Sequence, residues 1–237
     1  MPSSVSGRLR DLSARFGLPA TAAARFEALL DLVAGEPASI TSVRDPTHGV
    51  DVHIADSLVA LELDAVRSAT RMADLGSGAG FPGLALAIAL PDVEVALVES
   101  VVRKATFLRR AARALELDNV AVVPARAESW PDGLAAHDVV TARALAPLAV
   151  VLEYAAPLLE PGGTLVAWKG RLDHDEAGDA RAAAAVLGMT EPESRPVAPF
   201  ADARERALYL SSKVGPTPSA FPRREGMARK RPLRASS

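Results

Sequence analysis

The stretch Asp74-Leu75-Gly76-Ser77-Gly78-Ala79-Gly80-Phe81-Pro82-Gly83 decides how the rest of the chain folds. The residues from Met72 to Leu75 have the pattern of a buried strand, and the apolar run from Leu84 to Leu90 predicts a short packed helix. A strand, a glycine turn and a helix form the βα unit of doubly wound folds. Glycines let a backbone approach a ligand without Cβ clashes, and a helix N-terminus offers unpaired N–H groups. The stretch therefore predicts a cradle for a nucleotide-like ligand.

Composition limits the class of protein. The chain has 237 residues, 49% of them hydrophobic, which is enough for one domain with a substantial core and an extension. The absence of cysteine excludes disulfides, thiolate metal sites and cysteine nucleophiles, and we expect no metal. No apolar run is long enough to span a bilayer, and the first residues lack the apolar segment of a signal peptide. We therefore expect a cytoplasmic monomer with no membrane partner.

Strands and helices alternate after residue 65, which predicts an α/β fold with a doubly wound, mainly parallel sheet. Two amphipathic helices and a short helix from His53 to Leu63 form a predicted N-terminal helical extension, residues 1–65. The segments 195–200 and 207–212 predict a final antiparallel strand pair within the main domain, residues 66–214. A basic C-terminal tail, residues 215–237, follows and looks too polar to pack by itself. Ligands of such folds lie at the carboxyl ends of the strands.

Two cofactor classes fit the glycine turn. Gly78 to Gly83 spells G-x-G-x-x-G, and Glu99 ends the next predicted strand, where a carboxylate accepts the ribose hydroxyls of an adenosine. Asp74 discriminates between the classes, because we expect it to face the ligand. A carboxylate there would repel a pyrophosphate and attract the amino group and sulfonium of S-adenosylmethionine. Ala127-Glu128, after the third strand, occupies the position that contacts the adenine edge in methyltransferases. The sequence therefore favours S-adenosylmethionine, and a class I methyltransferase fold, over a dinucleotide.

The end of the fourth predicted strand, Thr141-Ala142-Arg143-Ala144-Leu145, is where acceptor chemistry takes place in these folds. It lacks the Asn/Asp-Pro-Pro-aromatic turn of enzymes that methylate exocyclic amines, and a pyrimidine C5 methyltransferase would need a cysteine. A ring nitrogen such as guanine N7 needs neither, because its lone pair is already exposed. Arg143 would be a poor base but a good anchor for a phosphate or a guanine acceptor atom.

Segments along most of the chain give a more specific resemblance. They are His53-Ile54-Ala55-Asp56-Ser57-Leu58, the glycine turn with its Gly-Phe-Pro-Gly ending, Leu97-Val98-Glu99-Ser100, Ala127-Glu128, Thr141-Ala142-Arg143-Ala144, Trp168-Lys169-Gly170, and Pro222-Arg223-Arg224-Glu225-Gly226 with Lys230-Arg231-Pro232-Leu233. In these segments the chain resembles the bacterial glucose-inhibited division protein B family, the small-subunit ribosomal RNA guanine-N7 methyltransferases. It departs from the family at Ser39-Ile40-Thr41, commonly Asn-Leu-Thr, and at Val52, where a basic residue is frequent.

The resemblance implies methylation of one guanine in 16S rRNA, with the small ribosomal subunit as partner. It implies cofactor contacts at Gly76, Phe81, Ala127, Glu128 and Arg143. To these we add Asp74, Gly78 and Glu99 from the glycine-turn argument.

We predict catalytic roles for Arg143, Asp56 and His53, although a helix cap or a core contact would also explain the last two. Lys169 is either a cation that meets RNA phosphate or a surface charge. From residue 223 onward six basic residues stand against one acid, which favours phosphate contacts at Arg223, Arg224, Lys230 and Arg231. Other classes remain open: methylation of a ribose 2′-OH or a small molecule, a non-catalytic RNA-binding assembly factor, and a dinucleotide oxidoreductase.

Overall fold

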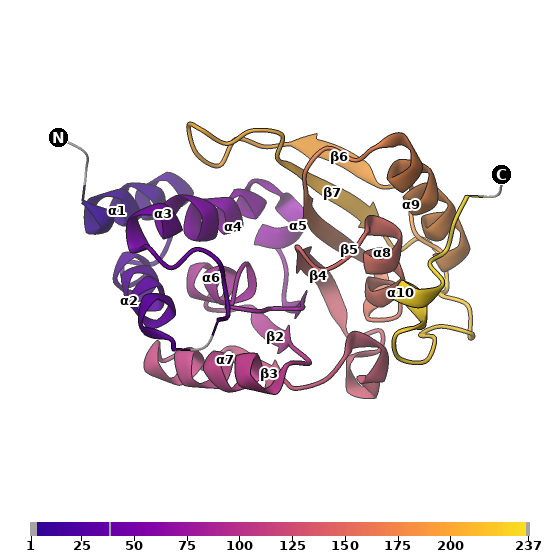
Figure 1. Cartoon of the computed structure of the whole chain (residues 1–237), viewed down its shortest axis with the longest axis horizontal. Helices are drawn as coiled ribbons and strands as arrows, with labels where there is room; N and C mark the ends of the chain where they lie inside the picture. Colours follow the sequence, from indigo (N-terminus) through magenta and orange to yellow (C-terminus); the bar gives the residue numbers. More distant parts are fainter. Residues whose placement is uncertain (1–3, 38, 236–237) are drawn as a thin grey trace.

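A computed structural model describes residues 4–37 and 39–235 and places one seven-stranded sheet at the centre of the chain (Figure 1). The strand order is β3-β2-β1-β4-β5-β7-β6, in which β1 to β5 run parallel and β7 and β6 are antiparallel. The strands are β1 Arg71–Leu75, β2 Glu94–Val98, β3 Val120–Val123, β4 His137–Arg143, β5 Leu159–Lys169, β6 Glu193–Pro196 and β7 Ala207–Ser212. The order reverses between β1 and β4, which opens a ligand crevice at their carboxyl ends. The predicted α/β, doubly wound, mainly parallel sheet is confirmed.

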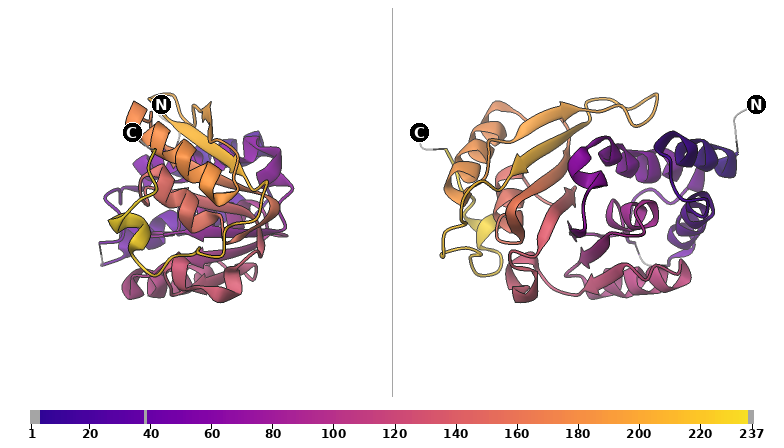
Figure 2. Two further views of the ribbon diagram at one scale, coloured as in Figure 1. Left: turned by 90° about the vertical axis from the view of Figure 1, so that its right-hand side faces the viewer. Right: turned by 180° about the vertical axis from the view of Figure 1, so that it is seen from behind.

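Helices cover both faces of the sheet (Figure 2). Two apolar clusters divide the core: one joins α1, α2, α6 and α7 to one face, and the other joins α8 and α9 to the opposite face. The longer helices are α1 Val5–Phe16, α2 Ala22–Gly35, α6 Gly83–Ala89, α7 Val102–Ala114, α8 Leu148–Ala155 and α9 His174–Leu187. The short ones are α3 Pro46–Gly49, the π-helix η1 Val50–Ala55, α4 Asp56–Leu58, η2 Val59–Glu62, α5 Asp64–Arg67, η3 Ala127–Ser129, η4 Pro131–Gly133 and α10 Met227–Lys230.

The N-terminal helices are part of the main core. Leu9 of α1 and Phe26 of α2 are fully buried in the same apolar cluster as Leu84 of α6. Helix α1 has well-defined ends, because the Ser4 side chain accepts a hydrogen bond from the Gly7 N–H and Gly17 adopts φ 64°. The extension thus holds η1 and α4 against the carboxyl edge of the sheet, while its boundary at residue 65 stays a prediction.

Local differences from the sequence prediction have clear causes. The short helix predicted from His53 begins earlier, at Pro46, because the Asp45 carboxylate accepts a hydrogen bond from the His48 N–H and caps the first turn. The sequence also predicts a helix over residues 145–159; the structure has α8 from Leu148, after Pro147, to Ala155. The Pro-Gly-Gly turn at residues 161–163, which predicts the end of that helix, lies inside the long strand β5, whose pairing with β4 shifts register there. Of the final strand pair, β7 agrees with the prediction, while β6 begins two residues early, at Glu193.

The C-terminal segment does not pack by itself, but it packs on the main domain. It runs past α9 and α8 and forms α10 beside α8 (Figure 1). Ala228 of α10 is 1% exposed within the second apolar cluster, and Phe221 and Leu233 pack against the same cluster. The C-terminal segment is therefore held in place by its packing on the second apolar cluster of the main domain.

No helix within residues 4–37 and 39–235 is both long and apolar enough to cross a membrane. The same described residues contain no group of three or more His, Asp or Glu side chains placed to hold a metal ion.

Candidate active site

The glycine turn joins β1 to α6 through backbone conformations and contacts that require glycine. Gly76, Gly78 and Gly80 adopt positive φ values of 67°, 56° and 95°. A Cβ on Gly83 would lie 2.3 Å from a Leu97 methyl carbon and 2.7 Å from Asp74 Oδ2. Without side chains at these positions, the turn packs closely over the carboxyl ends of β1 and β2. Its backbone can then lie directly against a ligand bound at the carboxyl edge of the sheet.

Asp74 lies beneath the turn and does not face an open pocket, which differs from the expectation that its carboxylate points at the ligand. It is fully buried, and its carboxylate accepts hydrogen bonds from the Gly83 N–H at 3.2 Å and the Thr141 hydroxyl at 2.8 Å. Burial raises the pKa of this carboxyl, and its hydrogen bonds oppose the shift. Asp74 thus fixes the turn to β4, and its direct contact with a cofactor stays a prediction.

Glu99 follows β2 and supports the turn from the other side. Its Oε2 accepts the Gly78 N–H at 3.0 Å, and its Oε1 accepts the Val101 N–H at 2.7 Å. Each carboxylate oxygen keeps a further lone pair for an outside donor. Glu99 therefore has the position and the acceptor capacity for its predicted ribose contact.

A small cavity opens beside the turn, which we call the turn cavity. It measures about 70 Å³ and is lined by residues of the turn, of the segment after β3, of the β4–α8 connection, of α8 and of the C-terminal segment. The lining residues used below are Gly76, Ala127, Glu128, Leu145, Tyr154 and Arg229. Three predicted cofactor residues, Gly76, Ala127 and Glu128, come together here.

The other predicted residues form a stacked cluster above the turn. The rings of His53 and Phe81 are parallel, with centroids 4.4 Å apart and an interplanar angle of 2°, and the Arg143 guanidinium carbon lies 5.7 Å from the Phe81 centroid. Arg143 Nη1 donates to Asp56 Oδ2 and to the Val52 carbonyl, both at 2.9 Å. The three residues predicted to be catalytic, His53, Asp56 and Arg143, thus meet with Phe81 although they come from η1, α4 and the end of β4.

Asp56 is the buried anion of this cluster. It is 1% exposed, and its second oxygen, Oδ1, accepts a hydrogen bond from Arg206 Nη1 at 3.1 Å. Its backbone carbonyl accepts the Trp168 indole N–H at 2.7 Å. Arg206 is not predicted from the sequence, because it lies 150 positions away in the charged β6–β7 connection, where nothing local indicates a contact with α4.

His53 is held as a neutral imidazole. Its Nε2 lies 2.9 Å from the Val43 carbonyl, an acceptor that fixes the proton on Nε2. Burial lowers the pKa of the ring, and the positive charge of Arg143 lowers it further. Within the described part of the chain, the buried Nδ1 has no hydrogen-bond partner. His53 therefore acts as a stacking partner of Phe81, with its lone-pair nitrogen closed off from solvent.

A second cavity, which we call the arginine cavity, lies next to this cluster. It measures about 440 Å³, within the range of small-molecule sites. Its charged lining consists of Asp56, Arg143, Lys169, Arg204, Glu205 and Arg206, with Trp168 beside them. Four cations against two acids give it a net positive charge, which favours an anionic ligand such as a nucleotide.

The predicted RNA-binding residues divide into two groups. Lys169 and Arg223 already have protein partners: Lys169 pairs with Glu176 and donates to the Ala146 carbonyl at 3.2 Å, and Arg223 Nε donates to Glu153 Oε1 at 2.6 Å. The other group, Arg224, Lys230 and Arg231, is exposed on the C-terminal segment. RNA contact by any of the five stays a prediction, and the exposed three are the better placed for it.

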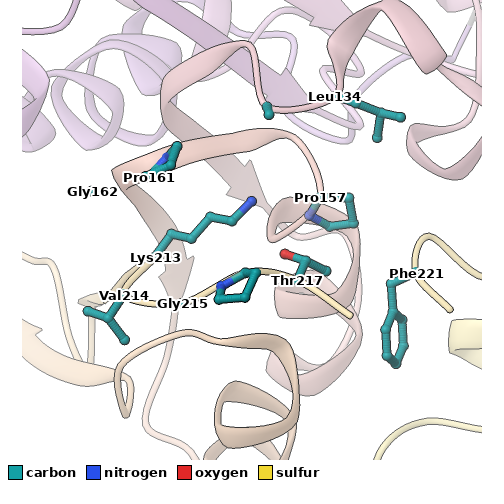
Figure 3. A pocket seen from close by; sticks show the side chains of 11 residues that line it. Leu134, Pro157, Pro161, Gly162, Lys213, Val214, Gly215, Thr217 and Phe221 are labelled. Atoms are coloured by element: carbon teal, nitrogen blue, oxygen red, sulfur yellow. The ribbon is translucent and has the colours of Figure 1, made fainter. Parts of the chain in front are cut away.

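A larger cavity lies at the other edge of the sheet, where β4 and β5 begin (Figure 3). It measures about 660 Å³ and its lining is mostly apolar, with the Lys213 side chain extending along it. Lys213 Nζ donates to the carbonyls of Ala156 and Leu159 at 2.8 and 2.7 Å. Ala156 ends α8, so this lysine satisfies the free carbonyls of a helix end. It has a structural role and lies far from the glycine turn.

Comparison with known proteins agrees with this geometry. A solved S-adenosylmethionine-dependent methyltransferase from Aquifex aeolicus superimposes with a TM-score of 0.57 at 15% identity, covering 76% of this chain and 99% of that one. The chain is 41% identical over 215 residues to the ribosomal RNA small subunit methyltransferase G of Chloroflexus aggregans, covering 89% of this chain and 90% of the relative. The corresponding protein of Desulfitobacterium hafniense is 40% identical over 201 residues, covering 84% and 83%.

The fold and the turn define a class I S-adenosylmethionine-dependent methyltransferase. Residues 22–199 match the GidB family, described as rRNA small subunit methyltransferase G, and the chain belongs to that family. S-Adenosylmethionine is its cofactor, and the site fits this molecule: the turn lets its backbone approach closely, Glu99 offers carboxylate acceptors, and the turn cavity gathers the residues predicted for its adenine. The cofactor supplies an electrophilic methyl group on a sulfonium.

Proposed function

We propose that this protein transfers the methyl group of S-adenosylmethionine to N7 of one guanine in 16S rRNA of the small ribosomal subunit. One observation carries the choice of atom: in the described structure, the buried acid and the imidazole beside Arg143 are both unavailable as bases. Asp56 is bound by two arginines, and the unprotonated nitrogen of His53 is buried against Phe81. Guanine N7 attacks with an existing lone pair, so the transfer needs no base.

In this proposal the acceptor guanine enters the arginine cavity, and Arg143 aligns it with the methyl group. The N7–carbon bond forms as the carbon–sulfur bond breaks, and the positive charge passes from sulfur to the base without loss of a proton. Asp56, held between Arg143 and Arg206, keeps the guanidinium of Arg143 in place and partly offsets the positive charge of the product. Alignment by such fixed groups is the main contribution of the chain to the rate.

The RNA backbone would lie along the basic surface beyond the cavity. Arg204 and Arg206 line its rim, and Arg224, Lys230 and Arg231 are exposed on the C-terminal segment. Contacts of lysine and arginine with phosphates release counterions, so binding should weaken steeply as salt rises. We propose further that the protein acts as a cytoplasmic monomer.

The test uses small-subunit rRNA made by transcription, which carries no modification, and tritiated S-adenosylmethionine. We expect label in the RNA, and after digestion to nucleosides we expect it in 7-methylguanosine alone. Label in a ribose-methylated nucleoside, with a rate that rises with pH as a base is deprotonated, would establish 2′-OH methylation instead. Absence of label from both naked RNA and reconstituted subunits would favour a non-catalytic assembly factor.

A further inference from the structure

The C-terminal segment forms part of the wall of the turn cavity. Its volume of about 70 Å³ is well below the roughly 300–1,000 Å³ typical of small-molecule sites. Arg229 of α10 forms part of its wall, facing Gly76 and Ala127 on the opposite elements. A basic residue from the end of the chain therefore lies where the cofactor residues converge.

Residues 221–235, which we call the C-terminal strap, contact the cavity lining at several points. The Gly226 N–H donates to Glu128 Oε1 at 3.0 Å, which engages the residue expected at the adenine edge. Arg229 Nη2 donates to the Leu145 carbonyl at 2.7 Å. Glu225 accepts a hydrogen bond from Ser129 Oγ at 2.5 Å and lies 3.4 Å from Arg126 Nε. These contacts span the cavity from the segment after β3 to the β4–α8 connection.

Anchors behind the cavity hold the strap in this position. Arg223 binds both carboxylate oxygens of Glu153, which is 2% exposed on α8. It also donates to the Arg231 carbonyl at 2.9 Å, which ties the two ends of α10 together. The Ala235 N–H donates to Asp179 on α9 at 3.0 Å. The strap is thus fixed on both sides of α10, and Arg229 between these anchors lines the turn cavity.

The two faces of α10 have different surroundings. Arg229 reaches the cavity wall beside Tyr154, and burial raises the pKa of that tyrosine, which keeps its hydroxyl a neutral partner. Lys230 and Arg231, the next residues, are exposed. Arg229 is itself exposed, but of the basic residues in the described part of this run it alone lines the turn cavity.

We propose that the C-terminal strap is a working part of the S-adenosylmethionine site and that Arg229 is a cofactor-binding residue. The strap lifts to admit the cofactor and closes again, with the planar guanidinium of Arg229 lying against the adenine ring. Guanidinium groups stack on aromatic rings and donate to ring nitrogens in a fixed plane, which matches an adenine at this position. The proposal rests on S-adenosylmethionine as the cofactor and does not depend on which RNA atom is methylated.

The first test measures binding of S-adenosylhomocysteine by calorimetry, which needs no RNA and no turnover. We expect Arg229→Ala to weaken binding about 10-fold, the size of a partly desolvated cation–π contact. Arg234→Ala, which removes an exposed arginine of the same strap, is the matched control and should change the dissociation constant less than about 2-fold. Thermal melting of each variant verifies folding. Unchanged or tighter binding by Arg229→Ala overturns the proposal, since tighter binding would mean that Arg229 only blocks the site.

The second test follows closure through amide hydrogen exchange of the full chain, with and without S-adenosylhomocysteine. We expect the ligand to slow exchange at Gly226, whose N–H binds Glu128, and over residues 226–231. Unchanged exchange there, with protection confined to the glycine turn, would contradict closure. Failure of the wild-type chain to bind the ligand would refute the cofactor itself, and binding without RNA methylation would refute only the proposed function.

Discussion

The two segments that flank the sheet reach the site in different ways. The N-terminal extension reaches it through the core: Phe26 is fully buried, and the extension contributes Asp56, a buried anion between two arginines. The C-terminal strap crosses the surface and is held by hydrogen bonds, by the Arg223–Glu153 ion pair and by a few apolar contacts around Ala228. The N-terminal extension, which we call the fixed flank, is therefore part of the core and fixes the acceptor side of the site. The C-terminal strap is held at the surface, and in our proposal it moves to close the cofactor side.

The largest expected effect tests the fixed flank. Asp56→Ala removes the only carboxylate that Arg143 and Arg206 share in the described structure, and breaking a buried ion pair costs about 3–5 kcal/mol. Urea unfolding should show a loss of this size together with loss of methyl transfer. Asp64→Asn, an exposed change in the same extension, should stay within about 0.5 kcal/mol. An equally stable Asp56→Ala protein would mean that the extension does not depend on this anion.

The next effect concerns activity more than folding. Arg143→Ala leaves Asp56 paired with Arg206, so we expect a folded protein whose rate of methyl transfer falls about 100-fold because the acceptor is misaligned. The rate with saturating S-adenosylmethionine and a melting curve are the two measurements. Binding of S-adenosylhomocysteine should change less than in Arg229→Ala. A larger loss of S-adenosylhomocysteine binding in Arg143→Ala than in Arg229→Ala would place Arg143 on the cofactor side and contradict the separate roles of the two segments.

The third prediction asks whether the strap detaches separately. Arg223→Ala leaves Glu153 buried without its partner, and because Arg223 is partly exposed we expect a cost of about 2–3 kcal/mol, below that of a fully buried pair. Hydrogen exchange should rise over residues 221–235 while β1 and β4 stay protected. Adding Glu153→Leu should recover part of the loss, because the uncompensated charge is gone. Exchange that rises equally in the sheet would show that the strap and the core unfold together.

The smallest effect is a pH dependence to which the N-terminal extension contributes through His53. The pKa of His53 is lowered by burial, so on acidification through about 6.5 the unfolded chain takes up a proton before the folded one does. Stability should therefore fall as pH drops, by at most about 1.4 kcal/mol per pH unit for this group. The pKa of His137 is also lowered, so His53→Phe should flatten the slope only in part. His174→Gln, at an exposed position, should leave the slope unchanged, and an unchanged slope in His53→Phe would contradict the prediction.

How far the sequence predicted the structure follows the same division. The spacing of apolar residues and the glycine-rich turn were sufficient to predict the sheet and the βα unit, because those signals are local. The position after the fourth strand indicated Arg143, and the segment from His53 to Leu58 indicated His53 and Asp56; the structure brings the three together. Arg206 was missed because its partner lies on α4, far away in sequence, and Arg229 was counted with an RNA-facing tail because charge alone does not say which way a side chain points. The Asp74 carboxylate points into the protein and not at a ligand, because it accepts hydrogen bonds from the Thr141 hydroxyl and the Gly83 N–H.

The most direct measurement of the central claim is cleavage mapping of small-subunit rRNA after reaction with the protein and S-adenosylmethionine. Borohydride and aniline cut RNA at 7-methylguanosine, so we predict one new break, at one guanine, which disappears with Arg143→Ala. Methyl label in the RNA with no new break would contradict transfer to N7. Breaks scattered over many guanines would contradict a site that fixes a single acceptor.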